Sequence, residues 1–169
     1  NGDNVLLDIT TFNICETIVQ TVNTLEGTAA KKEISFVLDY NTQKELLVEA
    51  DESKIHQVLY NLIDNAVKFS HNNSEIKISL RKKGAKVFVS VKDSGIGIPK
   101  ESLNKVFDRF YKTDISRGKD KRGTGLGLSI SKEIIQAHNQ TINVVSTVDV
   151  GTEFVFTLKY HSKKQEASS

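Results

Sequence analysis

The placement of glycine is the feature that most constrains this chain. It has ten glycines and one proline, and five of the glycines fall in two short clusters, Gly95/Gly97 and Gly123/Gly125/Gly127. Glycine and proline interrupt regular elements, so the long stretches without them can form helices and strands. Glycine also lets another group approach the backbone closely. We therefore expect function to lie at the two clusters.

Composition excludes several classes of protein. The 169 residues are 38% hydrophobic and 26% charged, which is typical of one soluble globular domain and excludes a disordered or fibrous chain. The net charge of +2 is too small to argue for nucleic acid. No apolar run is long enough to span a bilayer. Cys15 is the single cysteine, so no internal disulfide and no cysteine-based zinc site can form, which fits a reducing cytoplasm.

Hydrophobic spacing predicts three main helices and six strands. The helices are expected over 12–30, from an N-cap at Asp51 to about 70, and over 126–138. A short helix is expected to begin at Pro99 and end near Phe107, followed by a loop over 108–122. Strands are expected at 34–40, 46–50, 76–81, 87–92, 141–146 and 152–159.

This mix predicts an α/β (α+β) two-layer sandwich: a mostly antiparallel sheet with the helices on one face. One domain is expected over 1–160, followed by a polar tail over 161–169. Asn139 tolerates the left-handed backbone conformation, so we expect it to end the last helix.

The helix after Asp51 has an unusual polar side. At about 100° per residue, one stripe holds Gln57, Asn61, Asp64, Asn65 and Lys68. Exposed helical faces usually carry Glu, Lys or Arg, which are better helix formers than Asn. Two asparagines one turn apart offer neutral oxygens to a hard cation such as Mg²⁺, and Lys68 could meet a phosphate. The alternative is an ordinary solvated face.

The first glycine cluster lies in Asp93-Ser94-Gly95-Ile96-Gly97-Ile98-Pro99, directly after a predicted strand. A carboxylate at the end of that strand can accept a hydrogen bond from an exocyclic amine such as that of adenine. The two glycines would let the backbone approach a flat ligand. The alternative is a simple turn at the end of a strand.

The second cluster, Gly123-Thr124-Gly125-Leu126-Gly127-Leu128, opens a predicted helix. Exposed backbone N–H groups and the helix dipole make such a start an anion site, although the spacing fits neither a Walker A loop nor a dinucleotide fingerprint. The alternative is tight packing of the helix on the sheet.

The charged loop between the clusters could be a lid, with Lys112 reaching a terminal phosphate, or simply a solvated loop.

Four segments in this order resemble the catalytic ATP-binding domain of sensor histidine kinases, which has a Bergerat-type fold. Their N box is matched by 61–69, the first glycine box by 93–99, the F box by 107–110 and the second glycine box by 123–128. The wider superfamily includes type II topoisomerases, mismatch-repair ATPases, chaperone ATPases and anti-sigma-factor kinases. The F box and the form of the second glycine box favour the sensor kinases.

The resemblance implies a site for ATP and Mg²⁺. It implies Asn61 as the Mg²⁺ ligand with Asn65 beside it, Lys68 on a phosphate, and Asp93 on the adenine amine. It also implies nucleotide contacts or pocket-shaping and lid roles for Phe69, Gly95, Gly97, Ile98, Phe110, Tyr111, Lys112, Gly123, Thr124, Gly125, Leu126, Gly127, Leu128 and Thr152.

The implied catalytic residues are Gln57, Asn61 and Lys112. Gln57 stands one helical turn before Asn61, where related ATPases often carry a glutamate base. Glutamine is not a competent base, which disfavours attack by water and suits phosphoryl transfer to a protein acceptor.

None of the four histidines, His56, His71, His138 and His161, lies in an acceptor motif, and we expect all four at the surface or at helix ends. The resemblance therefore implies a larger parent protein, in which a histidine-containing dimerisation domain precedes this one. It also implies a response regulator downstream, no nucleic-acid partner, and a cytoplasmic position without membrane insertion of its own, in a membrane-anchored sensor.

The alternatives to a kinase domain are an ATP-responsive interaction module without transfer activity, and a nucleic-acid-associated ATPase. The net charge and Gln57 disfavour the second of these.

Overall fold

The computed structural model describes residues 6–40, 45–108 and 127–162. Within them the elements follow in the order β1 (Ile9–Asn13), α1 (Ile14–Ala30), β2 (Ser35–Asp39), β3 (Leu47–Asp51), α2 (Glu52–Phe69), β4 (Glu75–Lys83), β5 (Lys86–Lys92), the 3₁₀ helix η1 (Lys100–Lys105), α4 (Gly127–Ala137), β6 (Ile142–Thr147) and β7 (Gly151–Tyr160).

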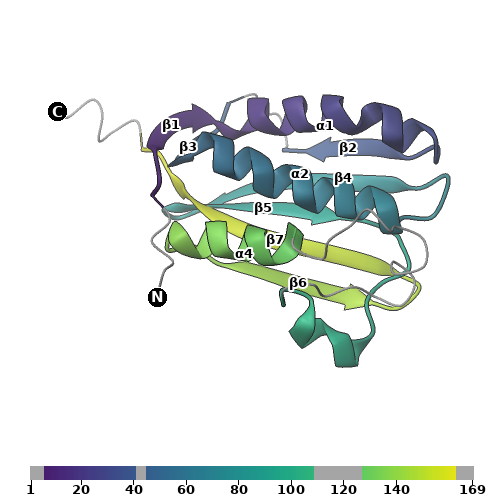
Figure 1. The fold of residues 1–169 in the computed structure, drawn as a ribbon. Helices are drawn as coiled ribbons and strands as arrows, with labels where there is room; N and C mark the ends of the chain where they lie inside the picture. The colour runs from purple at the N-terminus through teal and green to yellow at the C-terminus, as the bar shows by residue number, and fades with distance from the viewer. Residues whose placement is uncertain (1–5, 41–44, 109–126, 163–169) are drawn as a thin grey trace.

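The strands form one seven-stranded sheet in the order β1-β3-β7-β5-β4-β2, with β6 also paired to β7. The β2–β4 pair is parallel and the other pairs are antiparallel. The helices α1, α2 and α4 cover one face of the sheet (Figure 1). The predicted two-layer sandwich with a mostly antiparallel sheet is therefore confirmed.

Side-chain caps fix where the two long helices begin. The Asn13 side-chain oxygen accepts a hydrogen bond from the Cys15 N–H at 3.1 Å, so α1 starts directly after β1. Asp51 does the same for α2, accepting from the Lys54 N–H at 3.3 Å. The N-cap predicted at Asp51 is confirmed. After the C-terminal end of α4, Asn139 has a φ of 59°, so it adopts the left-handed conformation expected of it.

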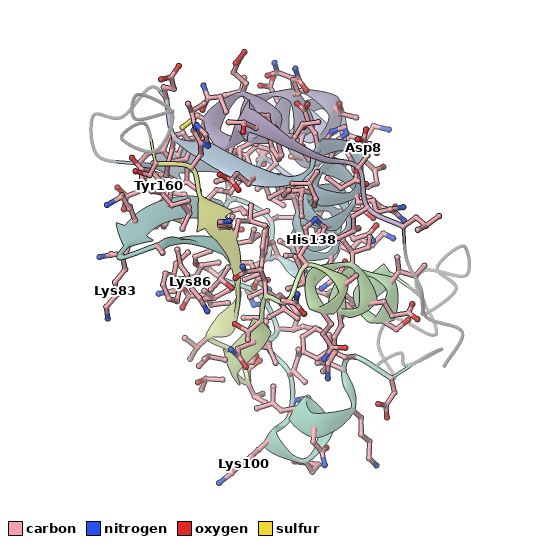
Figure 2. The ribbon with its side chains drawn as sticks, turned by 90° about the vertical axis from the view of Figure 1, so that its left-hand side faces the viewer. Asp8, Lys83, Lys86, Lys100, His138 and Tyr160 are labelled. Atoms are coloured by element: carbon pink, nitrogen blue, oxygen red, sulfur yellow. The ribbon has the colours of Figure 1, made fainter. Side chains whose placement is uncertain are left out.

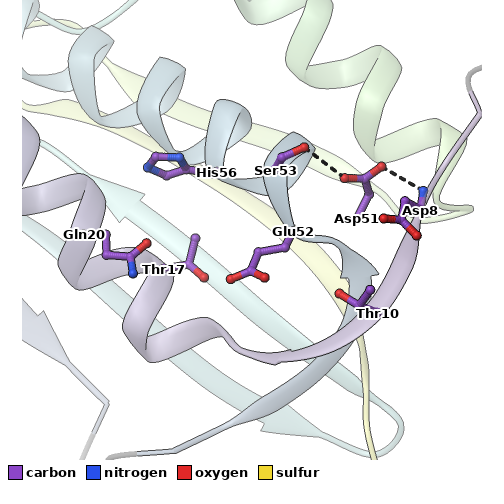
Figure 3. Close-up of a pocket in the computed structure, with 8 residues that line it drawn as sticks. All are labelled: Asp8, Thr10, Thr17, Gln20, Asp51, Glu52, Ser53 and His56. Carbon is purple, nitrogen blue, oxygen red and sulfur yellow. Dashed lines mark hydrogen bonds between the residues drawn. The ribbon is translucent and has the colours of Figure 1, made fainter.

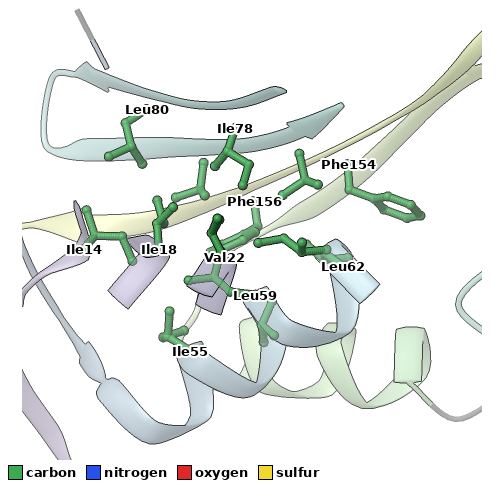
Figure 4. Packing of buried hydrophobic residues seen from close by; sticks show 14 of the residues in the cluster. Ile14, Ile18, Val22, Ile55, Leu59, Leu62, Ile78, Leu80, Phe154 and Phe156 are labelled. Carbon is green, nitrogen blue, oxygen red and sulfur yellow. The ribbon is translucent and has the colours of Figure 1, made fainter. Parts of the chain in front are cut away.

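The core lies between the helices and the sheet. Its largest fully buried side chains come from both layers, among them Ile18, Ile55, Leu59, Leu62 and Phe156, and Figure 4 shows these helical side chains packing toward the strands. Packing the apolar side of α2 inward leaves the polar stripe of that helix on the outside of the core. The fold thus presents that stripe for contacts with other parts of the chain or with a ligand.

The strand β1 was not predicted. The sequence predicted a helix from residue 12, whereas Thr10 and Phe12 pair with Ala50 and Val48 of β3, and α1 begins at Ile14. Because β1 is an edge strand, and because most of its residues are exposed, it lacks the apolar alternation that marks a strand. The apolar side chain of Val19 in α1 is 41% exposed.

His138 has a structural role beyond ending a helix. Its Nε2 accepts a hydrogen bond from the Asp51 N–H at 3.0 Å, and its Nδ1 lies 2.8 Å from the Ile134 carbonyl oxygen. Figure 2 labels the place of His138 in the molecule. Because Nε2 accepts, the ring is neutral and Nδ1 carries the proton. His138 therefore ties the C-terminal end of α4 to the junction of β3 and α2.

We predict that His138→Ala destabilises the fold. The substitution leaves the partly buried Asp51 N–H without its acceptor, which should lower the free energy of unfolding by about 1–3 kcal/mol. Urea unfolding of the variant measures the change. His71→Ala, at an exposed position, is the control and should stay within roughly 0.5 kcal/mol of the parent. Equal stability of the two variants would contradict the role assigned to His138.

Candidate functional site

Asp93 stands at the end of β5 as a buried carboxylate, 5% exposed. Its Oδ1 accepts hydrogen bonds from the Gly95 N–H at 2.9 Å and the Thr152 N–H at 3.2 Å. Burial raises the pKa of Asp93, and these two hydrogen bonds together with nearby His71 oppose that rise. The site thus holds a carboxyl group whose charge is offset by backbone donors rather than by a paired cation.

The second oxygen of Asp93 is the one available to a ligand. Both hydrogen bonds fall on Oδ1, and within the described part of the chain nothing donates to Oδ2. A carboxylate oxygen only accepts hydrogen bonds, so Oδ2 can take one from a ligand N–H placed against it. This arrangement agrees with the predicted acceptor for an exocyclic amine.

The glycines after Asp93 are required by contacts with the protein's own backbone. A Cβ added at Gly95 would lie 2.1 Å from the Phe69 carbonyl oxygen, and Ser70 forms an isolated β-bridge with Gly95. Gly97 has a φ of +74°, and its Cβ would lie 2.2 Å from the Thr147 carbonyl oxygen. These two glycines bring the loop against the end of α2 and the turn between β6 and β7. Close approach to a ligand, the reason inferred from the sequence, stays a prediction.

Sequence reasoning missed Gly151. Its Cβ would lie 2.1 Å from the Asp93 carbonyl oxygen, and the next residue exchanges hydrogen bonds with Asp93, since the Asp93 N–H donates to the Thr152 carbonyl at 2.9 Å. The buried Thr152 was predicted as a site residue, and the structure places it against Asp93. A glycine directly before a predicted strand was the signal that could have identified this position.

The polar stripe of α2 is partly occupied by internal contacts. Gln57 is exposed, Asn65 is half-buried, and Lys68 forms an ion pair with Asp64 at 3.1 Å, one helical turn away. A partly exposed pair of this kind contributes only about 0.3–0.5 kcal/mol, so it would not hold Lys68 against a strongly charged anion. The phosphate contact predicted for Lys68 stays a prediction.

Asn61 joins α2 to the start of α4. Its Nδ2 donates to the Gly127 carbonyl at 3.1 Å and lies 3.3 Å from the Ser131 hydroxyl oxygen. A Cβ at Gly127 would sit at an ordinary 3.7 Å from the Asn61 Cγ, so the space there is not tight. Two segments that were predicted to act together, 61–69 and the end of 123–128, are therefore in contact.

The remaining predicted site residues divide into two groups. Ile98 is buried and donates its N–H to the Ser146 hydroxyl at 2.7 Å, while Phe69 and Leu128 are half-buried. Phe107 packs edge-on against Phe154 with ring centroids 6.0 Å apart. The other predicted residues lie outside the described part of the chain: Phe110, Tyr111, Lys112, Gly123, Thr124, Gly125 and Leu126.

The donor set suits a cation held by neutral oxygens. Among the residues that the structure describes, no group of three His, Cys, Asp or Glu side chains could hold a metal ion. The Asn61 amide oxygen is a ligand type that Mg²⁺ accepts, and Mg²⁺ commonly keeps waters and phosphate oxygens as its other ligands. The residues present therefore fit a Mg²⁺ ion that arrives with a phosphate group.

A groove of about 390 Å³ elsewhere on the surface has a different chemistry (Figure 3). It lies between β1, α1 and the N-terminal end of α2, and it is lined by Asp8, Thr10, Thr17, Gln20, Asp51, Glu52, Ser53 and His56. Its Asp51 carboxylate accepts from the Asp8 N–H at 2.9 Å and from the Ser53 hydroxyl at 3.3 Å. Three carboxylates would repel a phosphate group, so we place the candidate site at Asp93 and Asn61 instead.

In the described ranges, no helix has the length and apolar character needed to cross a membrane.

Comparison with known proteins identifies the class of this fold and site. A solved catalytic domain of histidine kinase ThkA superimposes with a TM-score of 0.79 at 35% identity, covering 90% of this chain and 96% of that one. The same kinase in complex with the response regulator protein TrrA gives a TM-score of 0.77 at 34% identity, covering 94% of this chain and 43% of that one.

Sequence comparison agrees with the structural match. The model of the histidine kinase-, DNA gyrase B- and HSP90-like ATPase family matches residues 50–162, and the chain belongs to that family. It is 44% identical to sensor histidine kinase WalK of Bacillus subtilis (strain 168) over 125 residues. The aligned region covers 73% of this chain and 20% of that protein. The chain thus spans about a fifth of the length of that relative.

We predict that Gly95→Ala destabilises the fold through a steric clash. The added methyl group meets the Phe69 carbonyl, and forcing an extra carbon into a packed site should cost about 1–3 kcal/mol. Gly27→Ala is the matched control, because nothing lies within 4 Å of a Cβ there and the position is inside α1. That variant should gain about 0.5–1 kcal/mol. Urea unfolding measures both, and a stabilised Gly95→Ala protein would refute the close packing.

Proposed function

We propose that this domain binds Mg-ATP and transfers the γ-phosphoryl group to a histidine on a separate dimerisation domain, as the catalytic domain of a bacterial sensor histidine kinase. The observation that carries the proposal is the pair of contacts at the two ends of the segment 61–69 of α2. Asn61 meets the start of α4, and Phe69 meets the loop after Asp93. The two residues are eight positions apart, about 12 Å along the helix axis, so an extended nucleotide can lie between the two.

Each end has the chemistry for one part of ATP. At the Phe69 end, the free oxygen of Asp93 can accept from the adenine amine. At the Asn61 end, the amide oxygen can face a Mg²⁺ ion, which when bound neutralises charge on the phosphates. Gln57 is exposed one turn before Asn61 and supplies no base for water, which favours transfer to a protein acceptor over hydrolysis. Lys112 stays in the proposal as the residue that steadies the transferred group.

The histidines of this chain are poorly placed to accept the phosphoryl group. Both ring nitrogens of His138 are engaged, by the Asp51 N–H and the Ile134 carbonyl. His56 Nε2 is buried, and His161 Nδ1 lies 2.9 Å from a Glu49 carboxylate oxygen. His71 follows the end of α2 near Asp93, away from Asn61. These positions support an acceptor supplied by another domain.

The relatives support the kinase proposal over an interaction module without transfer activity. The Bacillus subtilis relative is named as a sensor histidine kinase, and one solved neighbour is a histidine kinase in complex with a response regulator protein. We therefore propose a histidine-containing dimerisation domain and a response regulator as partners of the parent protein. We also propose a cytoplasmic position for this domain in a membrane-anchored sensor.

We predict that adenine-nucleotide binding depends on Asp93. Asp93→Ala removes the acceptor for the adenine amine, so affinity should fall by about 1–3 kcal/mol, or roughly 5- to 150-fold. Calorimetric titration with a non-hydrolysable ATP analogue measures the loss, with the folded fraction checked by thermal unfolding. Asp39→Ala is the control, because it removes only a surface carboxylate paired with Lys77. If Asp93→Ala binds the ATP analogue within about twofold of the parent's affinity, Asp93 is not the acceptor for the adenine amine.

We predict that the isolated chain does not phosphorylate itself. Transfer needs a ring nitrogen in line with the γ-phosphorus at near-attack distance, and the histidines described here lack that placement. With radiolabelled Mg-ATP, no acid-labile label should appear until the parent's helical domain is added. Transfer should then be weak, because the tether that raises the effective concentration is absent. Label on the isolated chain would refute an acceptor elsewhere, and failure with the added domain at high concentration would favour the module without transfer activity.

A further inference from the structure

We infer that Ser131 is a positioning residue: its hydroxyl fixes which way the Asn61 amide faces, and thereby sets how strongly Mg²⁺ enhances nucleotide binding. Ser131 lies in α4, one turn after Gly127, and is fully buried. The inference rests on the proposed function, because it takes Asn61 as the residue that meets the Mg²⁺ ion.

The proton of the Ser131 hydroxyl is already committed. Its Oγ lies 2.9 Å from the Gly127 carbonyl oxygen, an oxygen that can only accept, so Ser131 is the donor in that contact. A serine hydroxyl has one proton and two lone pairs. Toward Asn61, whose Nδ2 lies 3.3 Å away, the same hydroxyl can therefore act only as an acceptor.

The Asn61 amide consequently faces two acceptors on one side. Its Nδ2 has two protons, and the Gly127 carbonyl at 3.1 Å and the Ser131 hydroxyl lie within reach of them. Turning the amide by 180° would set Oδ1 against both oxygens and lose both hydrogen bonds. The amide is thus held with Nδ2 toward α4 and Oδ1 away from it, and no residue in the described ranges donates to that oxygen.

A hydrogen bond from a buried serine to the carbonyl four residues earlier is common in helices and by itself indicates no function. The distinguishing feature is the second contact, because Ser131 also receives the side chain of Asn61 from another helix. Without the hydroxyl, the Gly127 carbonyl alone would hold the amide. The amide would then spend more time turned or displaced, and its oxygen would be less often available to the metal.

The test compares nucleotide affinity with and without Mg²⁺ by calorimetry, using a non-hydrolysable ATP analogue and the whole chain. In Ser131→Ala the enhancement by Mg²⁺ should fall by roughly three- to tenfold, as expected for one lost hydrogen bond, while the affinity without Mg²⁺ stays within about twofold. Ser131→Cys keeps a similar shape with a weaker acceptor and should fall between Ser131→Ala and the parent.

Ser129→Ala is the matched control. Ser129 is also a buried serine of α4, but its hydroxyl makes no hydrogen bond with Asn61. The control should keep the full Mg²⁺ enhancement. An equal loss in both variants would indicate a general effect on α4 and would overturn the inference, as would unchanged enhancement in Ser131→Ala.

A second measurement does not depend on nucleotide. In the ligand-free chain, exchange of the Asn61 side-chain amide protons with solvent can be followed by NMR, and it should be faster in Ser131→Ala and unchanged in Ser129→Ala. Unchanged exchange in Ser131→Ala would overturn the positioning role. Asn61→Ala separates the two claims. If that variant keeps its full Mg²⁺ enhancement, the metal role proposed for Asn61 fails, whereas amide exchange still decides whether Ser131 orients the side chain.

Discussion

The arrangement of the candidate site depends on one buried carboxylate. Asp93 is held by the N–H groups of Gly95 and Thr152, and its own backbone exchanges a hydrogen bond with Thr152. A buried carboxylate needs such donors, since an isolated charge at that depth is very costly. To supply them, the loop after β5 and the start of β7 must come together at one point. The loop then reaches the end of α2, where Gly95 packs against the Phe69 carbonyl.

The two ends of the segment 61–69 are therefore fixed by different kinds of contact. At Phe69 the contact is between its backbone carbonyl and the backbone of Gly95. A side chain at position 95 would push the loop away from the helix. At Asn61 it is a side-chain amide that bonds to α4, with ordinary van der Waals space at Gly127. The first contact positions the loop that carries Asp93, and the second positions the Asn61 amide.

The elements that follow a strong local rule could be predicted from the sequence. The cap at Asp51, the polar stripe of α2 and the left-handed Asn139 were all predictable, because each depends on side-chain chemistry within a few residues. The strand β1 was not predictable, since only its pairing with β3 makes it a strand. For the same reason the sequence did not indicate the packing of Gly95 against Phe69 or the hydrogen bond between His138 and Asp51. Contacts between residues far apart in the chain leave no local pattern.

The site that results is poor in charged metal ligands. In the described ranges no group of three His, Cys, Asp or Glu side chains could hold a metal ion, and Asp64, the carboxylate on the polar stripe, is paired with Lys68. A single neutral amide oxygen, with water as the other ligands, holds a divalent ion weakly, because Mg²⁺ loses its water reluctantly and prefers anionic oxygen. In the proposed function the triphosphate would supply that anionic oxygen. Metal and nucleotide binding would then be thermodynamically coupled, each raising the affinity for the other by the same factor. The orientation of the Asn61 amide oxygen, on which that coupling would depend, is fixed by α4.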